Sequence, residues 1–168
     1  MSTAVAKIVG RHQRVAFMNV STGEAAASYQ RMTNFTQMTN SKNPKEYSRQ
    51  YVDRESEDTD VVGYAPSIGY SFDRHTNTPV HERIAAIHDG ELVGADALVD
   101  IVIVDLFSGE KDVHVARKRT YSVIPDADGD GTDALVYSGT FKSKSEIEEG
   151  TASVSDDGKT LTYTAPVK

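Results

Sequence analysis

The chain has 168 residues, 38% of them hydrophobic, with no Cys, no Trp and a formal net charge of −7. This length suits one domain that can bury a core without disulfides or metals to stabilise it. The missing cysteines exclude disulfides, thiolate metal sites and cysteine nucleophiles. The sequence contains neither a run of ~20 apolar residues, as a membrane helix requires, nor a signal-peptide pattern. We therefore expect the protein to be made and kept in the cytosol, with no membrane association.

Charge is unevenly distributed along the chain. Residues 1–52 contain seven Lys or Arg and two acids, whereas residues 53–168 contain eleven Lys or Arg and 23 acids. The basic residues are dispersed and do not form the dense stripe with interleaved aromatics that is typical of a nucleic-acid site. Two interpretations stay open: complementary ends that favour head-to-tail association of copies, or ordinary solvated charge.

The first third of the chain predicts few core positions. Residues 1–14 lack periodicity and are expected to form an exposed N-terminal arm, and residues 15–20 are expected to form a short strand. Residues 28–60 are polar, with few large aliphatics, and predict a long projecting hairpin that is either mobile or covered by a partner. Its two strands and its turn are expected near residues 29–38, 46–53 and 40–44.

The middle of the chain predicts a strand followed by one convincing helix. The strand covers residues 61–74, where aromatic and aliphatic residues stand among small ones. The helix is expected to begin at Thr78-Pro79, an N-cap followed by a proline at the first helical position, and to stop at Asp89-Gly90. Between these signals, one apolar stripe suited to docking on a sheet is formed by Val80, Ile84 and Ile87.

The last part of the chain predicts consecutive antiparallel strands. Residues 97–107 are apolar on both faces and so predict a central strand. Strands are expected at residues 112–125 and 133–144, followed by a hairpin that pairs residues 151–155 with 160–164. The predicted fold is mainly β: an antiparallel β-sandwich or half-barrel with one flanking α-helix and a long projecting hairpin, as a single domain over residues 1–168.

One motif suggests a metal ion. The run Asp126-Ala-Asp-Gly-Asp-Gly131 has the carboxylates and the glycine of the first half of a calcium loop. However, Tyr137 stands where a bidentate Glu closes such a loop, and the flanking residues have the pattern of strands. We therefore interpret the motif as an acidic hairpin turn and expect no metal, with a calcium site as the alternative.

No catalytic constellation is recognisable in the sequence. The histidines are scattered, and His81 and His88 lie two helical turns apart, too far for one metal. There is no nucleophile elbow, P-loop or Gly-rich dinucleotide turn, so we expect neither enzymatic activity nor a cofactor. Arg117 and Arg119 share one face of a strand, which is either a subunit contact or a sheet face that emerges into solvent.

Several short motifs follow one another in a characteristic order. An Asn-Pro-Lys-Glu-Tyr turn (residues 43–47) leads to Arg-Gln-Tyr-Val-Asp (49–53), an acidic bridge (55–60) and Val-Val-Gly-Tyr-Ala-Pro-Ser-Ile-Gly-Tyr-Ser-Phe-Asp (61–73). The helix, the central strand and an Ala-Arg-Lys-Arg strand (116–119) follow. Over about residues 30–165, this order resembles the siphophage-type family of bacteriophage major tail tube proteins.

The resemblance implies a virion structural protein. Six copies would form a ring, and stacked hexameric rings would form the tail tube, a conduit through which DNA leaves the capsid without specific binding. Expected partners are other copies of the chain, the tape measure protein, and the tail initiator and terminator proteins. Assembly would take place in the host cytoplasm, and the projecting hairpin and terminal arms would touch the next ring.

Two groups of residues are candidates for these roles. Inter-subunit contacts are expected at Lys42, Asn43, Pro44, Lys45, Tyr47, Arg49, Arg117 and Arg119. Carboxylates that face the lumen would repel DNA, because each phosphate contact with Lys or Arg adds affinity and slows passage. The candidates for this acidic lining are Asp126, Asp128, Asp130, Asp133, Glu146, Glu148 and Glu149. The alternative function is a secreted or surface β-sandwich binding module, stabilised by calcium.

Overall fold

The centre of the molecule is a closed β-barrel. In this computed structural model, which describes residues 4–129 and 131–167, six antiparallel strands pair in the order β8-β7-β1-β2-β11-β10 and return to β8. They are β1 (Arg14–Asn19), β2 (Tyr29–Arg31), β7 (Leu98–Glu110), β8 (Val113–Gly129), β10 (Glu148–Val154) and β11 (Thr160–Thr164). The predicted mainly β, antiparallel fold is confirmed, and the expected half-barrel is in fact closed.

Closure depends on the length of β10. The sequence predicted only that this strand pairs with β11 in the final hairpin, which it does, with Thr151 opposite Thr164. The strand begins earlier than expected, and Glu148 and Glu149 pair with Lys118 and Arg117 of β8. The start of β8 is therefore shared between β7 and β10, and no edge of the barrel is left open at this point.

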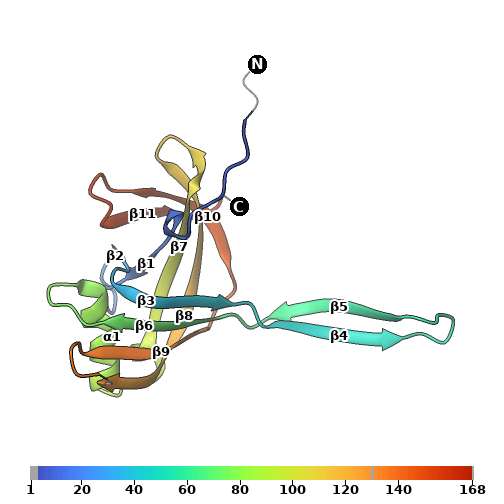
Figure 1. The fold of residues 1–168 in the computed structure, drawn as a ribbon, viewed down its shortest axis with the longest axis horizontal. Helices are drawn as coiled ribbons and strands as arrows, with labels where there is room; N and C mark the ends of the chain where they lie inside the picture. Colours follow the sequence, from blue (N-terminus) through green and yellow to red (C-terminus); the bar gives the residue numbers. More distant parts are fainter. Residues whose placement is uncertain (1–3, 130, 168) are drawn as a thin grey trace.

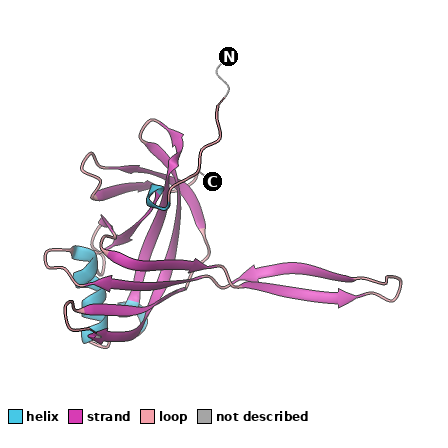
Figure 2. Ribbon diagram, in the orientation of Figure 1, coloured by secondary structure: helices cyan, strands magenta, loops and turns pink. Residues whose placement is uncertain are grey.

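Three further strands extend the sheet away from the barrel. The second half of β8 pairs with β9 (Val136–Ser143), followed by β6 (Ser67–Asp73) and β3 (Phe35–Ser41). The helix α1 (Pro79–Asp89) packs against this extension, and Figure 2 shows it, in cyan, at the end of the body opposite the projecting strands. One hydrophobic cluster lies under the helix and a second, smaller one fills the barrel. Among the described residues, no helix is long and apolar enough to cross a membrane.

The helix has the bounds that the sequence predicted, and Val80, Ile84 and Ile87 are fully buried. The ends of the helix differ in detail from the prediction. The Thr78 side chain makes no capping hydrogen bond, and the left-handed residue after the helix is Glu91 (φ 50°), not Gly90. The amides of Glu91 and Leu92 donate to the carbonyls of His88 and Ile87 at 3.2 and 3.1 Å, as in a Schellman motif.

The projecting hairpin is built differently from the prediction. Strands β4 (Pro44–Gln50) and β5 (Glu57–Tyr64) form a separate two-stranded sheet, while β3 pairs with β6. Residues 40–44 therefore do not reverse the chain, which turns instead at residues 51–56. The β4–β5 pair, here called the ribbon, projects from the body as a long arm (Figure 1). The expected pairing of residues 29–38 with 46–53 is wrong.

Asn43 explains why the chain bends at this point without reversing. It has a positive φ of 46°, a conformation that Asn tolerates better than most residues. Its side-chain amide donates to the carbonyl oxygen of Ala65 at 3.1 Å and to Ser67 Oγ at 3.2 Å. The bend therefore holds the two long strands of one continuous hairpin together where they leave the body, and Pro44 begins β4, a place where its missing amide is tolerated.

The acidic motif at residues 126–131 also departs from the prediction. Asp126 and Asp128 belong to β8, which continues past Pro125 through a bulge to Gly129. The expected turn therefore starts later, because the bulge absorbs one extra residue without ending the strand. Asp130 lies outside the described residues.

Candidate assembly surface

The ribbon buries none of its side chains. Every residue of β4 is exposed, and β5 has no buried residue. Among the exposed residues are large apolar ones: the tip carries Val52 and Tyr51, and the part near the body carries Tyr64, Val61 and Val62. An isolated two-stranded hairpin is marginally stable in water because it has no core. The exposed apolar side chains of the ribbon therefore form a surface suited to contact with a partner.

The predicted contact residues of β4 share one face of the ribbon. Lys45, Tyr47 and Arg49 are alternate residues of a strand and so point the same way. Arg49 Nη1 donates to the Tyr47 hydroxyl at 2.7 Å, and Asp58 stands opposite Arg49 on β5. The other face carries the cross-strand pair Ser48–Thr59, whose hydroxyls lie 2.9 Å apart. Asn43 and Pro44 lie at the bend and are also exposed.

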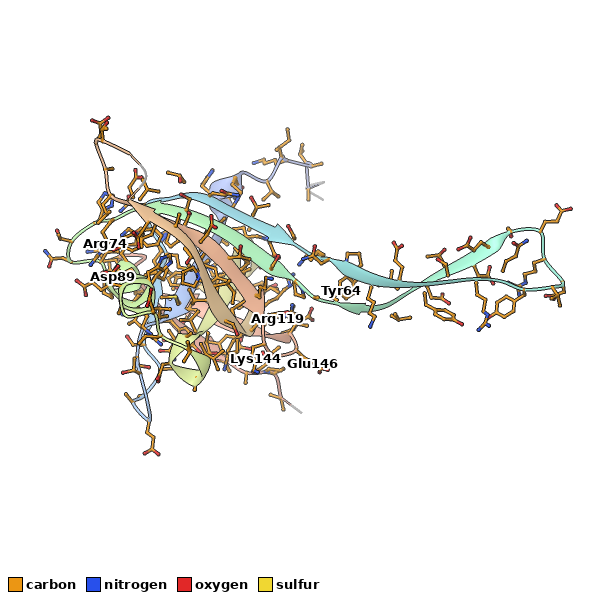
Figure 3. The ribbon with its side chains drawn as sticks, turned by 90° about the horizontal axis from the view of Figure 1, so that it is seen from below. Tyr64, Arg74, Asp89, Arg119, Lys144 and Glu146 are labelled. Atoms are coloured by element: carbon orange, nitrogen blue, oxygen red, sulfur yellow. The ribbon has the colours of Figure 1, made fainter. Side chains whose placement is uncertain are left out.

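A groove of about 510 Å³ lies where the ribbon joins the body. Here called the basic groove, it is lined by five basic residues and by apolar or aromatic ones that include Ile103 and Tyr121; the basic residues are Arg14, Lys42, Arg117, Lys118 and Arg119. Figure 3 shows Arg119 on the side of the body that faces the ribbon, towards Tyr64 at the ribbon's root. The structure thus brings together predicted contact residues from two separate segments: Lys42, which follows β3, and Arg117 and Arg119 of β8.

Asp105 organises two of the arginines of this groove. Its carboxylate is buried and accepts from Arg14 Nε at 2.7 Å and from Arg117 Nη1 at 2.9 Å. Burial alone would raise the pKa of Asp105, but the hydrogen bonds and charges of Arg14 and Arg117 outweigh it and hold the pKa below its usual value. Asp105 was not predicted as a site residue, although an acid within an apolar strand signals that it needs a partner.

Arg119 differs from these two arginines. Its Nε atom is buried and has no hydrogen-bond partner among the described residues, which is costly for a polar group. Lys118, its neighbour on β8, lies over the ring of Tyr163 on the barrel side, with Nζ 5.5 Å from the ring centroid. Glu149 is the acidic side chain that lines the groove. The groove therefore keeps an excess of positive charge in a protein that is acidic overall.

The acids predicted to line a lumen fall into two groups at opposite ends of β9. Asp126, Asp128 and Asp133 lie at the end that carries α1, whereas Glu146, Glu148 and Glu149 follow β9 at the end near the ribbon. Figure 3 shows this separation through Asp89, at the end of α1, and Glu146. Glu148 is half-buried, and its Oε1 accepts from the Tyr163 hydroxyl at 3.1 Å. Whether either group faces a lumen stays a prediction.

The two helical histidines take part in packing. His81 is fully buried: its Nδ1 accepts from the His75 amide at 3.0 Å, and its Nε2 lies 2.8 Å from the Thr33 carbonyl. His88 Nε2 lies 2.6 Å from the Tyr70 hydroxyl. Burial lowers the pKa of both histidines. Each ring therefore joins the helix to another segment of the fold, His81 to Thr33 and His75, and His88 to β6.

Comparison with known proteins adds little to this description. The sequence matches no family model and no curated protein. One similar solved structure is the cryo-EM structure of the anti-feeding prophage (AFP) baseplate, 6-fold symmetrised. It has a TM-score of 0.45 and 10% sequence identity over 89% of this chain and 97% of that chain. At this level the likeness carries no statement about function.

Proposed function

We propose that this protein is a virion structural subunit that polymerises as stacked hexameric rings into a bacteriophage tail tube. The observation that supports the proposal best is the ribbon: a long exposed arm with apolar side chains and no core of its own. Such an element gains little by folding alone, because ordering each backbone residue costs about 1–2 kcal/mol. Contact with a neighbouring copy would cover its apolar side chains and offset that cost.

The open edge of the sheet supports assembly in a second direction. The nine-stranded sheet ends at β3, since its other end, β10, returns to β8. The edge strand, Phe-Thr-Gln-Met-Thr-Asn-Ser, carries no charge and no proline. Soluble monomers usually protect such an edge with lysine, proline or a bulge that twists it away. In β3 the register with β6 shifts between Phe35 and Gln37, and Arg11 Nη2 donates to the Met38 carbonyl at 3.5 Å. The regular, uncharged stretch from Gln37 to Ser41 is the part suited to pairing with the sheet of a neighbour within a ring.

The remaining parts of the proposal follow from the sequence resemblance. The tube would conduct DNA and would bind it weakly, since carboxylates facing the bore repel phosphates within a screening length of about 8–10 Å. The tape measure protein and the tail initiator and terminator proteins would be the partners at the interior and the ends. In this role the chain acts as a structural element of the virion tail and catalyses no reaction.

Electron microscopy of the purified protein at high concentration tests the proposal. We expect tubes with sixfold end views. The matched control replaces residues 45–63 with an Asn-Gly turn, which can join the paired residues Pro44 and Tyr64 through a short hairpin. This variant should remain folded and monomeric. A parent protein that stays monomeric at every concentration, or a shortened variant that forms tubes equally well, would contradict the proposal.

A further inference from the structure

We propose that the basic groove is the receptor for the acidic tip of the ribbon, residues 51–60, of a second copy of this chain. This contact rests on the proposed function, since it would be the way in which successive copies recognise each other. The charge, the apolar residues and the positions of the two surfaces support it.

The charge of the tip is the first support. Residues 51–60 contain five acids, Asp53, Glu55, Glu57, Asp58 and Asp60, and one basic residue, Arg54. Arg54 is already engaged, because it pairs with Asp58 and its guanidinium lies 5.7 Å from the centroid of the Tyr51 ring. Within the described parts of the chain, the other four acids of the tip form no ion pair. They present uncompensated negative charge at the far end of an arm.

The polar groups of the groove are the second support. Asp105 compensates part of the charge of Arg14 and Arg117, and Lys118 lies over the ring of Tyr163. Lys42 and Arg119 are therefore the groove cations best suited to accept a new carboxylate. Arg119, whose buried Nε has no hydrogen-bond partner among the described residues, is one of the residues that line this groove. A carboxylate matches the planar donor fork of a guanidinium, so an acid from the tip would pair with the guanidinium of Arg119.

The apolar residues of the two surfaces also match. The lining of the groove includes Ile103 and Tyr121, while the turn of the tip carries Tyr51 and the fully exposed Val52. Both surfaces thus combine apolar side chains with charged ones, and their charges are of opposite sign. Hydrophobic centres with polar rims are typical of protein interfaces.

Geometry requires that the two surfaces belong to different copies. Tyr64, the last residue of the ribbon, lines the groove. The ribbon extends away from the body, so its own tip lies at the far end of the molecule (Figure 1). Contact between a tip and a groove on different parts of the surface is heterologous, and it repeats from copy to copy. The resulting head-to-tail series is the arrangement that an extended polymer needs.

Reciprocal charge reversal tests this contact in the full-length protein. A groove variant, Lys42→Glu with Arg119→Glu, and a tip variant, Glu55→Lys with Glu57→Lys, should each need a concentration at least about tenfold higher to associate. An equimolar mixture should associate at the parent's concentration, because each acidic tip meets a basic groove and each basic tip an acidic one. Lys42→Glu alone, at an exposed position, should give a smaller shift in the same direction if Arg119→Glu impairs folding.

The control carries the same type of charge change at another place. Lys159 is exposed in the turn between β10 and β11, and Lys159→Glu should associate as the parent does. Association is measured by sedimentation velocity, which detects pairs and short chains as well as tubes. Pairs that follow the charge pattern without any tube would therefore support the contact and refute the tube. Groove variants that associate like the parent, or a mixture that fails to recover, would overturn the contact.

A short DNA duplex distinguishes the other candidate occupant, a nucleic-acid phosphate. The parent protein and the groove variant should bind the duplex equally weakly. If the groove variant loses DNA binding while its association is unchanged, the groove serves nucleic acid and the proposed contact is wrong.

Discussion

Strands β5 and β6 follow each other directly in the chain and have similar lengths, yet they bury their side chains in opposite ways. In β6, buried and partly exposed residues alternate, and Ile68, Tyr70 and Phe72 lie in the core. In β5, none of the residues is buried, although Val61, Val62 and Tyr64 are as apolar as their counterparts. The backbone pairing is antiparallel in both strands, so the difference lies in what covers them.

The contrast separates two sources of stability. The body is stabilised by its own core, in which the aromatic rings of Tyr70, Phe72, Tyr137 and Phe141 stack between the sheet and the helix. The ribbon has only its ladder of backbone hydrogen bonds and a few exposed side-chain contacts, which contribute little in water. A continuous hairpin thus passes from a self-sufficient sheet to an arm that a partner has to complete.

Hydrogen exchange of the dilute monomer is expected to show the largest difference between the two regions. Amides of β4 and β5 should open with a free energy near zero, whereas those of β7 should approach the global stability of about 5–15 kcal/mol. In the assembled form, the ribbon amides should become protected. Equal protection of both regions in a dilute monomer would mean that the ribbon is stable without a partner, and the contrast would fail.

A pair of matched substitutions gives the next largest effect. Ile84→Asp places a carboxylate in the fully buried stripe of α1, which costs several kcal/mol, a large part of the stability of a domain. Val62→Asp makes the same chemical change on the exposed ribbon and should leave the melting temperature of the monomer unchanged. The soluble yield and the thermal unfolding curve of each variant measure the difference. A folded Ile84→Asp monomer would mean that the helix stripe is not part of the core.

The elements predicted correctly have strong local signals. The bounds of α1 follow from Pro79 and from one apolar stripe, and the central strand β7 follows from a run that is apolar on both faces. The prediction of the hairpin was wrong because an Asn-Pro sequence indicates that the chain changes direction but not by what angle. The outcome depends on the pairing of β3 with β6, in which Phe35 lies opposite Phe72, and a contact so distant in sequence leaves no local pattern.

The candidate surface was predictable only as separate parts. Lys42, Arg117 and Arg119 were proposed as contacts from their own segments, but their meeting in one groove depends on the strand order β8-β9-β6-β3 and on the bend at Asn43. Asp105 was missed because its importance arises from Arg14, which lies opposite it on β1. Properties of a single strand were therefore predictable, whereas a surface to which several strands contribute side chains was not.

A moderate effect is expected from pH, and it should concern the body alone. Burial lowers the pKa of His81; the charges of His75 and Arg74 act in the same direction, and the hydrogen bond to the Thr33 carbonyl opposes them. Burial also lowers the pKa of His88, and the charges of Asp128 and Asp89 oppose this shift. Because the folded pKa lies below the unfolded value of about 6.5, the unfolded chain binds protons first as the pH falls. Stability is therefore complete above about pH 6.5 and decreases below it, until the pH passes the folded pKa.

Urea unfolding between about pH 7.5 and about pH 5.5 measures this loss, with a slope of at most about 1.4 kcal/mol per pH unit for each histidine. Asp105 should not interfere, since its lowered pKa places its own loss of stability at more acidic pH. The variant His81→Gln removes one titrating ring and should reduce the slope. A stability that is independent of pH over this range would show that the helix histidines are not buried as neutral rings.

Calcium is expected to have no effect on the thermal stability of the body. This tests whether the body, like the ribbon, depends on a partner outside the chain. Asp126 and Asp128 belong to a strand paired with β9, and an extended strand does not wrap its alternate carboxylates around one ion as a calcium loop does. Tyr137, where a closing Glu would stand, is buried and donates from its hydroxyl to Asp89 Oδ1 at 3.1 Å. Millimolar calcium or a chelator should therefore leave the melting temperature unchanged, and Asp126→Asn with Asp128→Asn should behave as the parent does with and without the ion. A rise of several degrees with calcium that this double variant abolishes would identify a metal site at the helix end of β8, and the body would then share the ribbon's dependence on something outside the chain.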